Sequence, residues 1–104
     1  MKVKRYEILL PLRYNDQTLV EEEKFFETEQ DLIDQFGAVS VDWVVVSGKW
    51  IYQNVTYHDR LVRLRIDVPD SAATRSFIRS YKQTLKKRFR QKDVWITVQD
   101  LRII

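Results

Sequence analysis

Residues 55–68 read VTYHDRLVRLRIDV, and this stretch decides the fold. Apolar side chains recur at every second position of its second half: Val62, Leu64, Ile66 and Val68. Charged side chains occupy the alternate positions: Arg63, Arg65 and Asp67. A period of two is the spacing of a strand that is buried on one face. The stretch is therefore predicted to form a long strand whose apolar side faces a core.

The preceding segment has the composition of a second strand. Residues 38–46 are rich in β-branched residues, with Val39, Val41, Trp43 and Val45 on one side, and residues 50–52 resume that composition. Ser47-Gly48 between them indicates a bulge or bend. Gln53-Asn54 is a plausible two-residue turn. Together the two strands are predicted to form a long hairpin.

Two further strands lie near the ends of the chain. Between Lys2 and Leu12, apolar side chains fall at every second position: Tyr6, Ile8, Leu10 and Leu12. Pro11 lacks an N–H group, so regular pairing is expected to stop or bulge there. Residues 94–98 are predicted to form the last strand.

Two amphipathic helices separate these strands. The first is predicted over residues 19–36, because Thr18 and Glu21 have capping-box spacing and Gly37 suits the position after the helix. Its apolar stripe is Phe25, Phe26, Leu32, Ile33 and Phe36. The second is predicted over residues 72–91, after the cap Pro69-Asp70-Ser71. Its stripe is Phe77, Ile78, Tyr81, Leu85 and Phe89.

The element order is therefore β-α-β-β-α-β in a chain of 104 residues. This order predicts an α+β ferredoxin-like sandwich, with two helices on one face of a four-stranded antiparallel sheet. Right-handed crossovers give the spatial strand order 4-1-3-2. Residues 1–104 are interpreted as one domain.

Composition excludes several classes of function. With no Cys, the chain has no disulfide framework and no thiol chemistry, and with one His it offers no pair of imidazole metal ligands. No catalytic residue, metal or cofactor is predicted. Neither an export signal nor a run of about 18 apolar residues is visible, so the expected location is cytoplasmic, with no membrane partner.

Charge is divided between the two helical segments. Residues 18–37 hold seven acidic residues and one Lys, for −6, whereas residues 70–92 hold eight basic residues and one Asp, for +7. The favoured interpretation is attraction between the helices or with a neighbouring subunit. The alternative is an anion-binding stripe for nucleic acid phosphates, formed by Arg75, Arg79, Lys82, Lys86 and Arg90.

The uncovered sheet face is the second candidate surface. With Leu9, Val44 and Val46 it is expected to expose apolar groups, and the last strand is an edge with little protective charge, followed by Ile103-Ile104. Burial against a second copy would cover both, so a homodimer is the predicted partner. RNA stacking on this face, through Arg13, Arg63, Arg65 and Trp43 or Trp95, is a minority hypothesis, because the outward positions of residues 63–67 carry no aromatic platform.

The hairpin also carries a set of aromatic residues. Ligand-pocket candidates are Trp50, Tyr52, Tyr57, His58 and Tyr81. The alternative for the hairpin members is cross-strand packing. His58 and Asp59 point to opposite strand faces, so they form no catalytic dyad.

Several short motifs resemble a family of small bacterial proteins known only as a domain of unknown function. They are residues 5–12 (RYEILLPL), 48–50 (GKW), 59–64 (DRLVRL), 81–82 (YK), 88–91 (RFRQ) and Val94. The resemblance covers about residues 5–98 and implies no catalytic residues. It suggests that Gly48, Trp50, Tyr81, Phe89 and Gln91 belong together.

The favoured hypothesis is a non-enzymatic domain that acts through homodimerisation and association with protein partners. A cofactor-free enzyme or small-ligand binder of the dimeric α+β-barrel type, in which paired sheets enclose a pocket, is one alternative. A cavity of about 300 Å³ or more lined by Trp, Tyr, His58 and Arg would favour it. Nucleic acid binding through the second helix is the other alternative.

Overall fold

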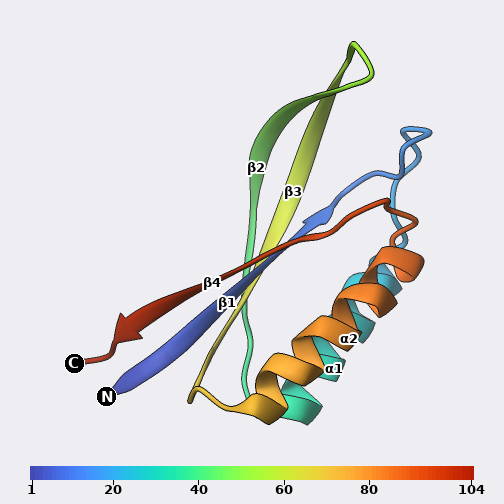
Figure 1. The fold of residues 1–104 in the computed structure, drawn as a ribbon. Helices are drawn as coiled ribbons and strands as arrows, with labels where there is room; N and C mark the ends of the chain where they lie inside the picture. Colours follow the sequence, from blue (N-terminus) through green and yellow to red (C-terminus); the bar gives the residue numbers. More distant parts are fainter.

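The computed structural model describes residues 1–43 and 47–104. Its elements are β1 Lys2–Pro11, α1 Glu22–Phe36, β2 Ser40–Tyr52, β3 Val55–Val68, α2 Ala72–Arg88 and β4 Trp95–Arg102. The strands form an antiparallel sheet in the order β2-β3-β1-β4, which confirms the predicted spatial order. Both helices lie on one face of this sheet, and the β2-β3 hairpin projects beyond them (Figure 1). The predicted α+β class is confirmed.

The structure has one stretch of β pairing in addition to the four predicted strands. Arg13 and Leu19 form an isolated antiparallel bridge outside the named strands, which makes a fifth stretch of β pairing. Beside it, the Tyr14 N–H donates to the Thr18 carbonyl at 2.8 Å. The segment after β1 is therefore a folded loop rather than a simple turn.

This loop explains why α1 begins three residues later than predicted. Asp16 accepts hydrogen bonds from both the backbone N–H of Thr18, at 2.9 Å, and its hydroxyl, at 2.6 Å. Thr18 is therefore occupied by an Asx turn and does not cap the helix. The N-cap is Glu21, without a side-chain capping bond. The end was predicted correctly, because Gly37 has the left-handed φ of 82°.

The predicted apolar stripe of α1 is partly wrong. Phe25 and Leu32 are buried, but Phe26 and Ile33 are 51% and 42% exposed. Consecutive residues of a helix lie about 100° apart, so only one member of each adjacent apolar pair can face the sheet. Thr28 takes the position between Phe25 and Leu32 and is fully buried.

Helix α2 begins as predicted and ends earlier. Ser71 is the N-cap, and its side chain accepts the Thr74 N–H at 3.1 Å. The helix ends at Arg88 instead of residue 91, because Arg90 has a φ of 54°, which is left-handed and stops the helical repeat. The chain then turns back towards the sheet, and β4 continues to Arg102 instead of ending at residue 98.

The hairpin differs from its prediction in one place. Its turn is as predicted, since Gln53 and Asn54 both have positive φ, of 50° and 63°. The irregularity lies between Asp42 and Val46 rather than at Ser47-Gly48, because β2 has two more residues than β3 between the flanking pairs. The expectations for the side chains of residues 44–46 concern positions outside the described residues.

The core lies between the sheet and the helices. The predicted inward positions of β3 are confirmed, since the side chains of residues 62, 64, 66 and 68 are all buried. The largest fully buried side chains from the other elements include Ile8, Leu10, Leu32, Leu85 and Phe89. Phe25 and Phe89 meet with ring centroids 5.3 Å apart. Both helices are thereby packed onto the same apolar layer.

The two helices are also joined by a polar network around Arg88. Its guanidinium donates to Asp31 at 2.9 Å, to the Thr28 hydroxyl at 2.9 Å and to Glu27 at 3.2 Å. Tyr81 donates its hydroxyl to Asp31 at 2.9 Å. Because the Arg88 side chain is only 12% exposed, these bonds replace much of its hydration. The attraction predicted between the helices is therefore carried by this buried arginine.

Replacing Arg88 with Ala should lower the free energy of unfolding by about 2–3 kcal/mol, because Asp31 and Thr28 lose their buried donor. Urea unfolding followed by circular dichroism measures the change. The matched control is Lys87→Ala, at the adjacent exposed position, with an expected change below about 0.5 kcal/mol. Equal effects of the two substitutions would contradict the role given to Arg88.

Candidate functional site

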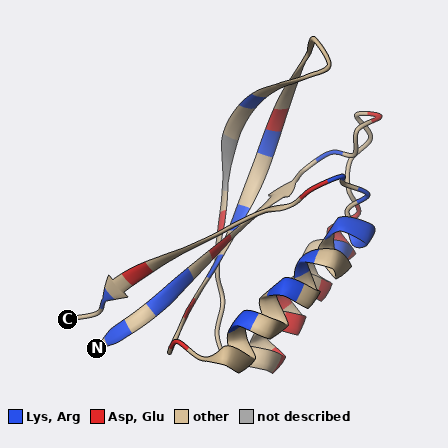
Figure 2. Cartoon of the chain, viewed as in Figure 1, with Lys and Arg blue, Asp and Glu red and all other residues tan. Residues whose placement is uncertain are grey.

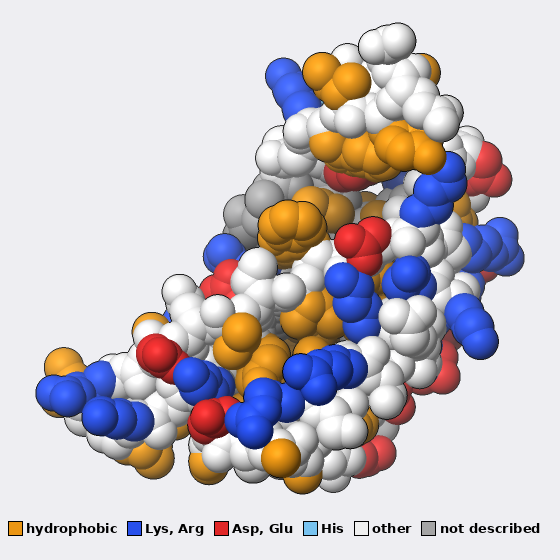
Figure 3. Space-filling view, viewed as in Figure 1, with side chains coloured by type: hydrophobic (Ala, Val, Ile, Leu, Met, Phe, Trp, Pro, Cys, Tyr) orange, Lys and Arg blue, Asp and Glu red, His pale blue; other side chains and the backbone are white. Residues whose placement is uncertain are grey.

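A hollow of about 850 Å³ lies beneath the projecting β2-β3 hairpin. Side chains and backbone from the hairpin, the end of β1, the following loop and the segment between α2 and β4 line it: Leu9, Pro11, Asn15, Gly48, Lys49, Trp50, Tyr52, Tyr57, Asp59, Leu61, Gln91, Lys92, Asp93 and Trp95. Figure 3 shows the molecule hollowed between the hairpin and the body, with hydrophobic side chains gathered there and charged ones around them. The site combines aromatic walls with charged groups.

The hairpin wall is built on one cross-strand pair. Trp50 of β2 lies opposite Tyr57 of β3 in the register, so their side chains share a sheet face. The rings stack at 4.4 Å with an angle of 16°. The Trp50 indole N–H donates to the Asp59 carboxylate at 2.5 Å, which fixes the orientation of the indole. Tyr52 continues this wall, 6.3 Å from the Trp50 ring centre.

The opposite wall comes from the segment that joins α2 to β4. Trp95 pairs with Leu9 and is 65% exposed. Lys92 reaches across to the hairpin, where its ammonium lies 4.7 Å from the centre of the Tyr52 ring. Asp93 is held by Lys82 of α2 at 3.0 Å, and this hydrogen bond keeps the pKa of Asp93 below its ordinary value. The α2 helix thus positions the second wall through an ion pair.

Three of the five predicted pocket residues come together in this hollow: Trp50, Tyr52 and Tyr57. His58 does not, because it pairs with Lys49 at a register position on the other face of the hairpin. Tyr81 is buried between the helices, and this burial, with the hydrogen bond to Asp31, raises the pKa of its hydroxyl. Of the residues that the resemblance groups together, Gly48, Trp50 and Gln91 line the hollow, whereas Tyr81 and Phe89 belong to the core.

The sequence did not indicate the second wall. Lys92 ends a run of basic residues and was counted only as charge, and Asp93 was not singled out. Trp95 was considered for a stacking surface on the sheet but not for a pocket. Only the early end of α2 and the turn at Arg90 place these residues opposite the hairpin. The spacing of apolar residues along the sequence does not indicate such a chain reversal.

The uncovered sheet face is polar at its centre, which corrects the apolar face expected from the sequence. Arg5 binds Asp67 across β1 and β3 with two hydrogen bonds, of 2.8 and 3.0 Å. Asp42 accepts from Arg63 at 2.9 Å and lies 3.6 Å from Arg65. Apolar contacts remain at the hollow end, where Leu9 and Leu61 lie. Charged side chains of β1, β2 and β3 on this face therefore form ion pairs between neighbouring strands.

Two residues of the proposed RNA-stacking surface, which was the minority hypothesis, lie in other parts of the fold. Arg13 donates to the Gln17 carbonyl at 2.8 Å within the loop after β1. Trp43 packs on the helix side, 5.6 Å from the Phe25 ring. The absence of an aromatic platform on residues 63–67 holds, since these positions form ion pairs.

The candidate anion-binding stripe follows α2, where Lys and Arg positions contrast with the acidic positions of α1 behind it (Figure 2). Part of the stripe has internal partners. Arg75 pairs with Asp70 at 2.6 Å, Lys82 with Asp93 at 3.0 Å, and the Arg90 guanidinium lies 4.6 Å from the Tyr14 ring centre. Phosphate binding by this stripe stays a prediction, with fewer free cations than the sequence indicates.

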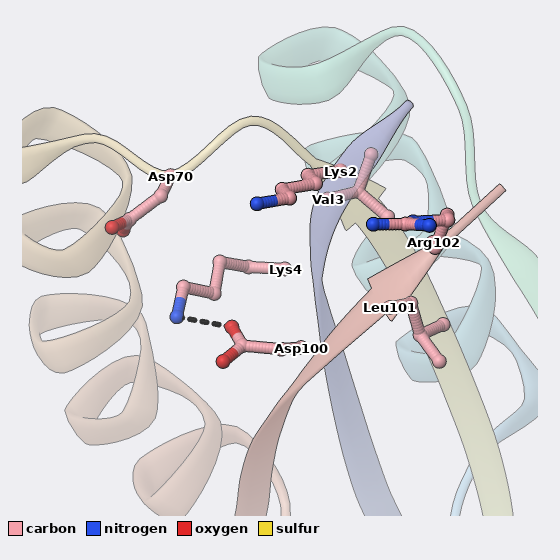
Figure 4. A pocket seen from close by; sticks show the side chains of 7 residues that line it. All are labelled: Lys2, Val3, Lys4, Asp70, Asp100, Leu101 and Arg102. Carbon is pink, nitrogen blue, oxygen red and sulfur yellow. Dashed lines mark hydrogen bonds and ion pairs between the residues drawn. The ribbon is translucent and has the colours of Figure 1, made fainter.

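A second cavity, of about 470 Å³, lies where the chain termini meet β3 and α2. Lys2, Val3, Lys4, Asp70, Asp100, Leu101 and Arg102 line it (Figure 4). Part of its charge is paired within the protein, because Lys4 binds Asp100 and Asp70 binds Arg75. This internal pairing makes it a weaker candidate for a ligand site than the aromatic hollow.

The fold and the hollow define an α+β sandwich domain with a candidate small-molecule site. Solved structures that share this fold include the following two. A phage SAM lyase in complex with S-methyl-5′-thioadenosine is 15% identical, with a TM-score of 0.71 over 93% of this chain and 80% of the lyase chain. The divalent cation tolerance protein Cut A1 from Thermus thermophilus is 14% identical, with a TM-score of 0.62 over 99% and 84% of the chains. At these identities the likeness shows the fold alone.

Neither a protein-family model nor a curated protein matches the sequence. The resemblance to a family of small bacterial proteins therefore stays a prediction. Within residues 1–43 and 47–104, no helix is long and apolar enough to cross a membrane. In the same part of the chain, no group of three His, Asp or Glu side chains is arranged to hold a metal ion.

Replacing Asp67 with Asn should lower the free energy of unfolding at pH 7 and lower it by less at pH 3. The hydrogen bonds from Arg5 lower the pKa of Asp67 below its ordinary value. Its stabilisation is therefore full above the unfolded pKa of about 3.9 and is lost as the pH falls through the lower folded pKa. Urea unfolding of both proteins at the two pH values measures this difference. A deficit at pH 3 as large as the deficit at pH 7, or no deficit at pH 7, would refute the role of this pair.

Proposed function

We propose that the hollow binds a small organic ligand through a flat aromatic ring. The observation that carries this proposal is the pair of aromatic walls, with Trp50, Tyr52 and Tyr57 on one side and Trp95 on the other. Its volume of about 850 Å³ falls within the range of about 300–1,000 Å³ that is usual for small-molecule sites. Aromatic side chains bind heterocycles by stacking, with little dependence on the exact ring.

The geometry supports ring binding more than simple cross-strand packing. The Trp50 and Tyr57 rings stack on each other, yet Trp50 remains 44% exposed and Trp95 65% exposed. Neither residue belongs to the buried core. Leu9, Pro11 and Leu61 form an apolar floor between the walls. Exposed aromatic rings around an apolar floor are suited to exclude water from a bound ring.

The phage SAM lyase that shares the fold holds S-methyl-5′-thioadenosine, a purine nucleoside thioether. This compound has a flat heterocycle and an apolar methylthio group, which match aromatic walls and an apolar floor. It is therefore a suitable first probe for the hollow.

Isothermal titration of the full chain with S-methyl-5′-thioadenosine should give saturable binding, and Trp50→Ala should weaken it by about tenfold or more. The matched control is Ile51→Ala, because Ile51 is the next residue of the strand, lies on the other face and is 73% exposed. Absence of binding by the unmodified chain at about 1 mM ligand would reject the proposal. Equal weakening by both substitutions would also count against it.

Self-association is a second candidate function, favoured by the free edge of β4. This strand pairs with β1 on one side only, and its Val98 is 54% exposed although it lies on the helix side of the sheet. An unpaired edge with an exposed β-branched side chain favours pairing with another strand. We infer that a second copy of the chain covers this edge.

Light scattering at about 100 µM should then report a dimer, and Val98→Lys should weaken the association by about tenfold or more, because a charge at the edge opposes strand pairing. The control is Ile51→Lys, at an exposed position of the hairpin, and it should leave the dimer intact. A monomer at this concentration for the unmodified chain would refute the inference.

A further inference from the structure

Lys92 occupies part of the aromatic hollow. Its ammonium lies 4.7 Å from the centre of the Tyr52 ring, although the two residues come from opposite walls. The face of an aromatic ring attracts a cation through its quadrupole. One wall of the hollow is therefore already in contact with a positive group of the protein itself.

Of the three other charged residues that line the hollow, two are carboxylates. Asp59 lies on the hairpin wall, where it accepts the Trp50 indole N–H. Asp93 lies on the other wall, bound to Lys82. Lys49 also lines the hollow, but it pairs with His58 at a register position on the other face of the hairpin. Lys92 is thus the one described lysine placed at an aromatic wall.

Aromatic faces combined with carboxylates are the chemistry that binds organic cations such as sulfonium and quaternary ammonium groups. These cations are weakly hydrated compared with an ammonium group, so they lose less on leaving water. A ligand cation can therefore replace the Lys92 ammonium at the Tyr52 ring, and Lys92 can then return to solvent through its flexible side chain.

We propose that the ligand of the hollow carries an organic cation beside its aromatic ring, and that Lys92 is a built-in competitor that this cation displaces. The inference rests on the proposed function, because it specifies the class of ligand for the same hollow. Tyr52 and Asp59 are assigned to the cation, and Trp50 and Trp95 to the ring.

The test compares S-adenosylmethionine with S-adenosylhomocysteine, which differ by one methyl group and its positive charge. Titration calorimetry of the full chain should show about tenfold or greater preference for the sulfonium compound. Asp59→Asn should remove most of this preference, because the amide oxygen can still accept the Trp50 N–H but carries no charge. Asp34→Asn, on the exposed side of α1, is the control and should keep the preference.

Lys92→Gln supplies the test of displacement. It should tighten binding of S-adenosylmethionine by about threefold or more, with a smaller effect on S-adenosylhomocysteine. Weaker binding of the sulfonium compound by this variant would show that Lys92 contacts the ligand and would overturn its role as a competitor.

The outcomes separate this inference from the proposed function. Equal affinity for both compounds would overturn the cation and leave ring binding in place. Failure of both compounds and of S-methyl-5′-thioadenosine to bind at about 1 mM would reject the ring site together with the cation. Binding of S-methyl-5′-thioadenosine without binding of S-adenosylmethionine would reject the cation alone.

Discussion

The point at which the chain leaves β3, just after the end of β1 at Pro11, is the constraint from which the candidate site follows. Strand β1 pairs with β3 as far as Pro11 opposite Leu61, and one further bond runs from the Leu12 N–H to the Arg60 carbonyl at 2.9 Å before the chain leaves β3. The hairpin nevertheless continues from Leu61 to its turn at Gln53 and Asn54 without a third strand. This two-stranded projection leaves Trp50 and Tyr57 above the end of the sheet. The hollow is therefore a consequence of unequal strand lengths.

The second wall depends on where α2 stops. Arg88 anchors the end of the helix in the polar network with α1, and Arg90 then takes a left-handed conformation that reverses the chain. The ion pair of Lys82 with Asp93 holds the returning segment against the helix. Lys92 and Trp95 are consequently brought to the face on which the hairpin aromatics lie. The basic residues of this segment therefore have three different roles: Arg88 joins the helices, Lys82 holds Asp93, and Lys92 lines the hollow.

Much of the fold could be predicted because its signals are local. The period of two in residues 62–68, the left-handed Gly37 and the interruption at Pro11 each state a backbone requirement through one or a few side chains. The start of α1 was missed because Asp16 competes for the hydrogen-bonding groups of Thr18. Exposure of Phe26 and Ile33 was missed because an apolar pair in a helix does not reveal which member faces the sheet.

One wall of the candidate site could be predicted from the sequence, because its signal is also local. Trp50, Tyr52 and Tyr57 share a hairpin face through alternation, so they could be grouped from the sequence, and the same rule should have separated His58 from them. The opposite wall requires a chain reversal and an ion pair between distant residues, Lys82 and Asp93, for which sequence spacing carries no signal. The polar sheet centre was missed likewise, because Asp42 meets Arg63 only once the register of the hairpin is known.

The positions of the aromatic residues separate folding from binding in this protein. Tyr81 and Phe89 lie in the buried core, where loss of a ring removes contacts with both helices or the sheet. Trp50, Tyr57 and Trp95 lie outside that core, and the strands and helices are packed without them. Exposed aromatic surface carries a risk of nonspecific association, and the core does not require it here. Its position around an apolar floor therefore agrees with the proposed ligand site.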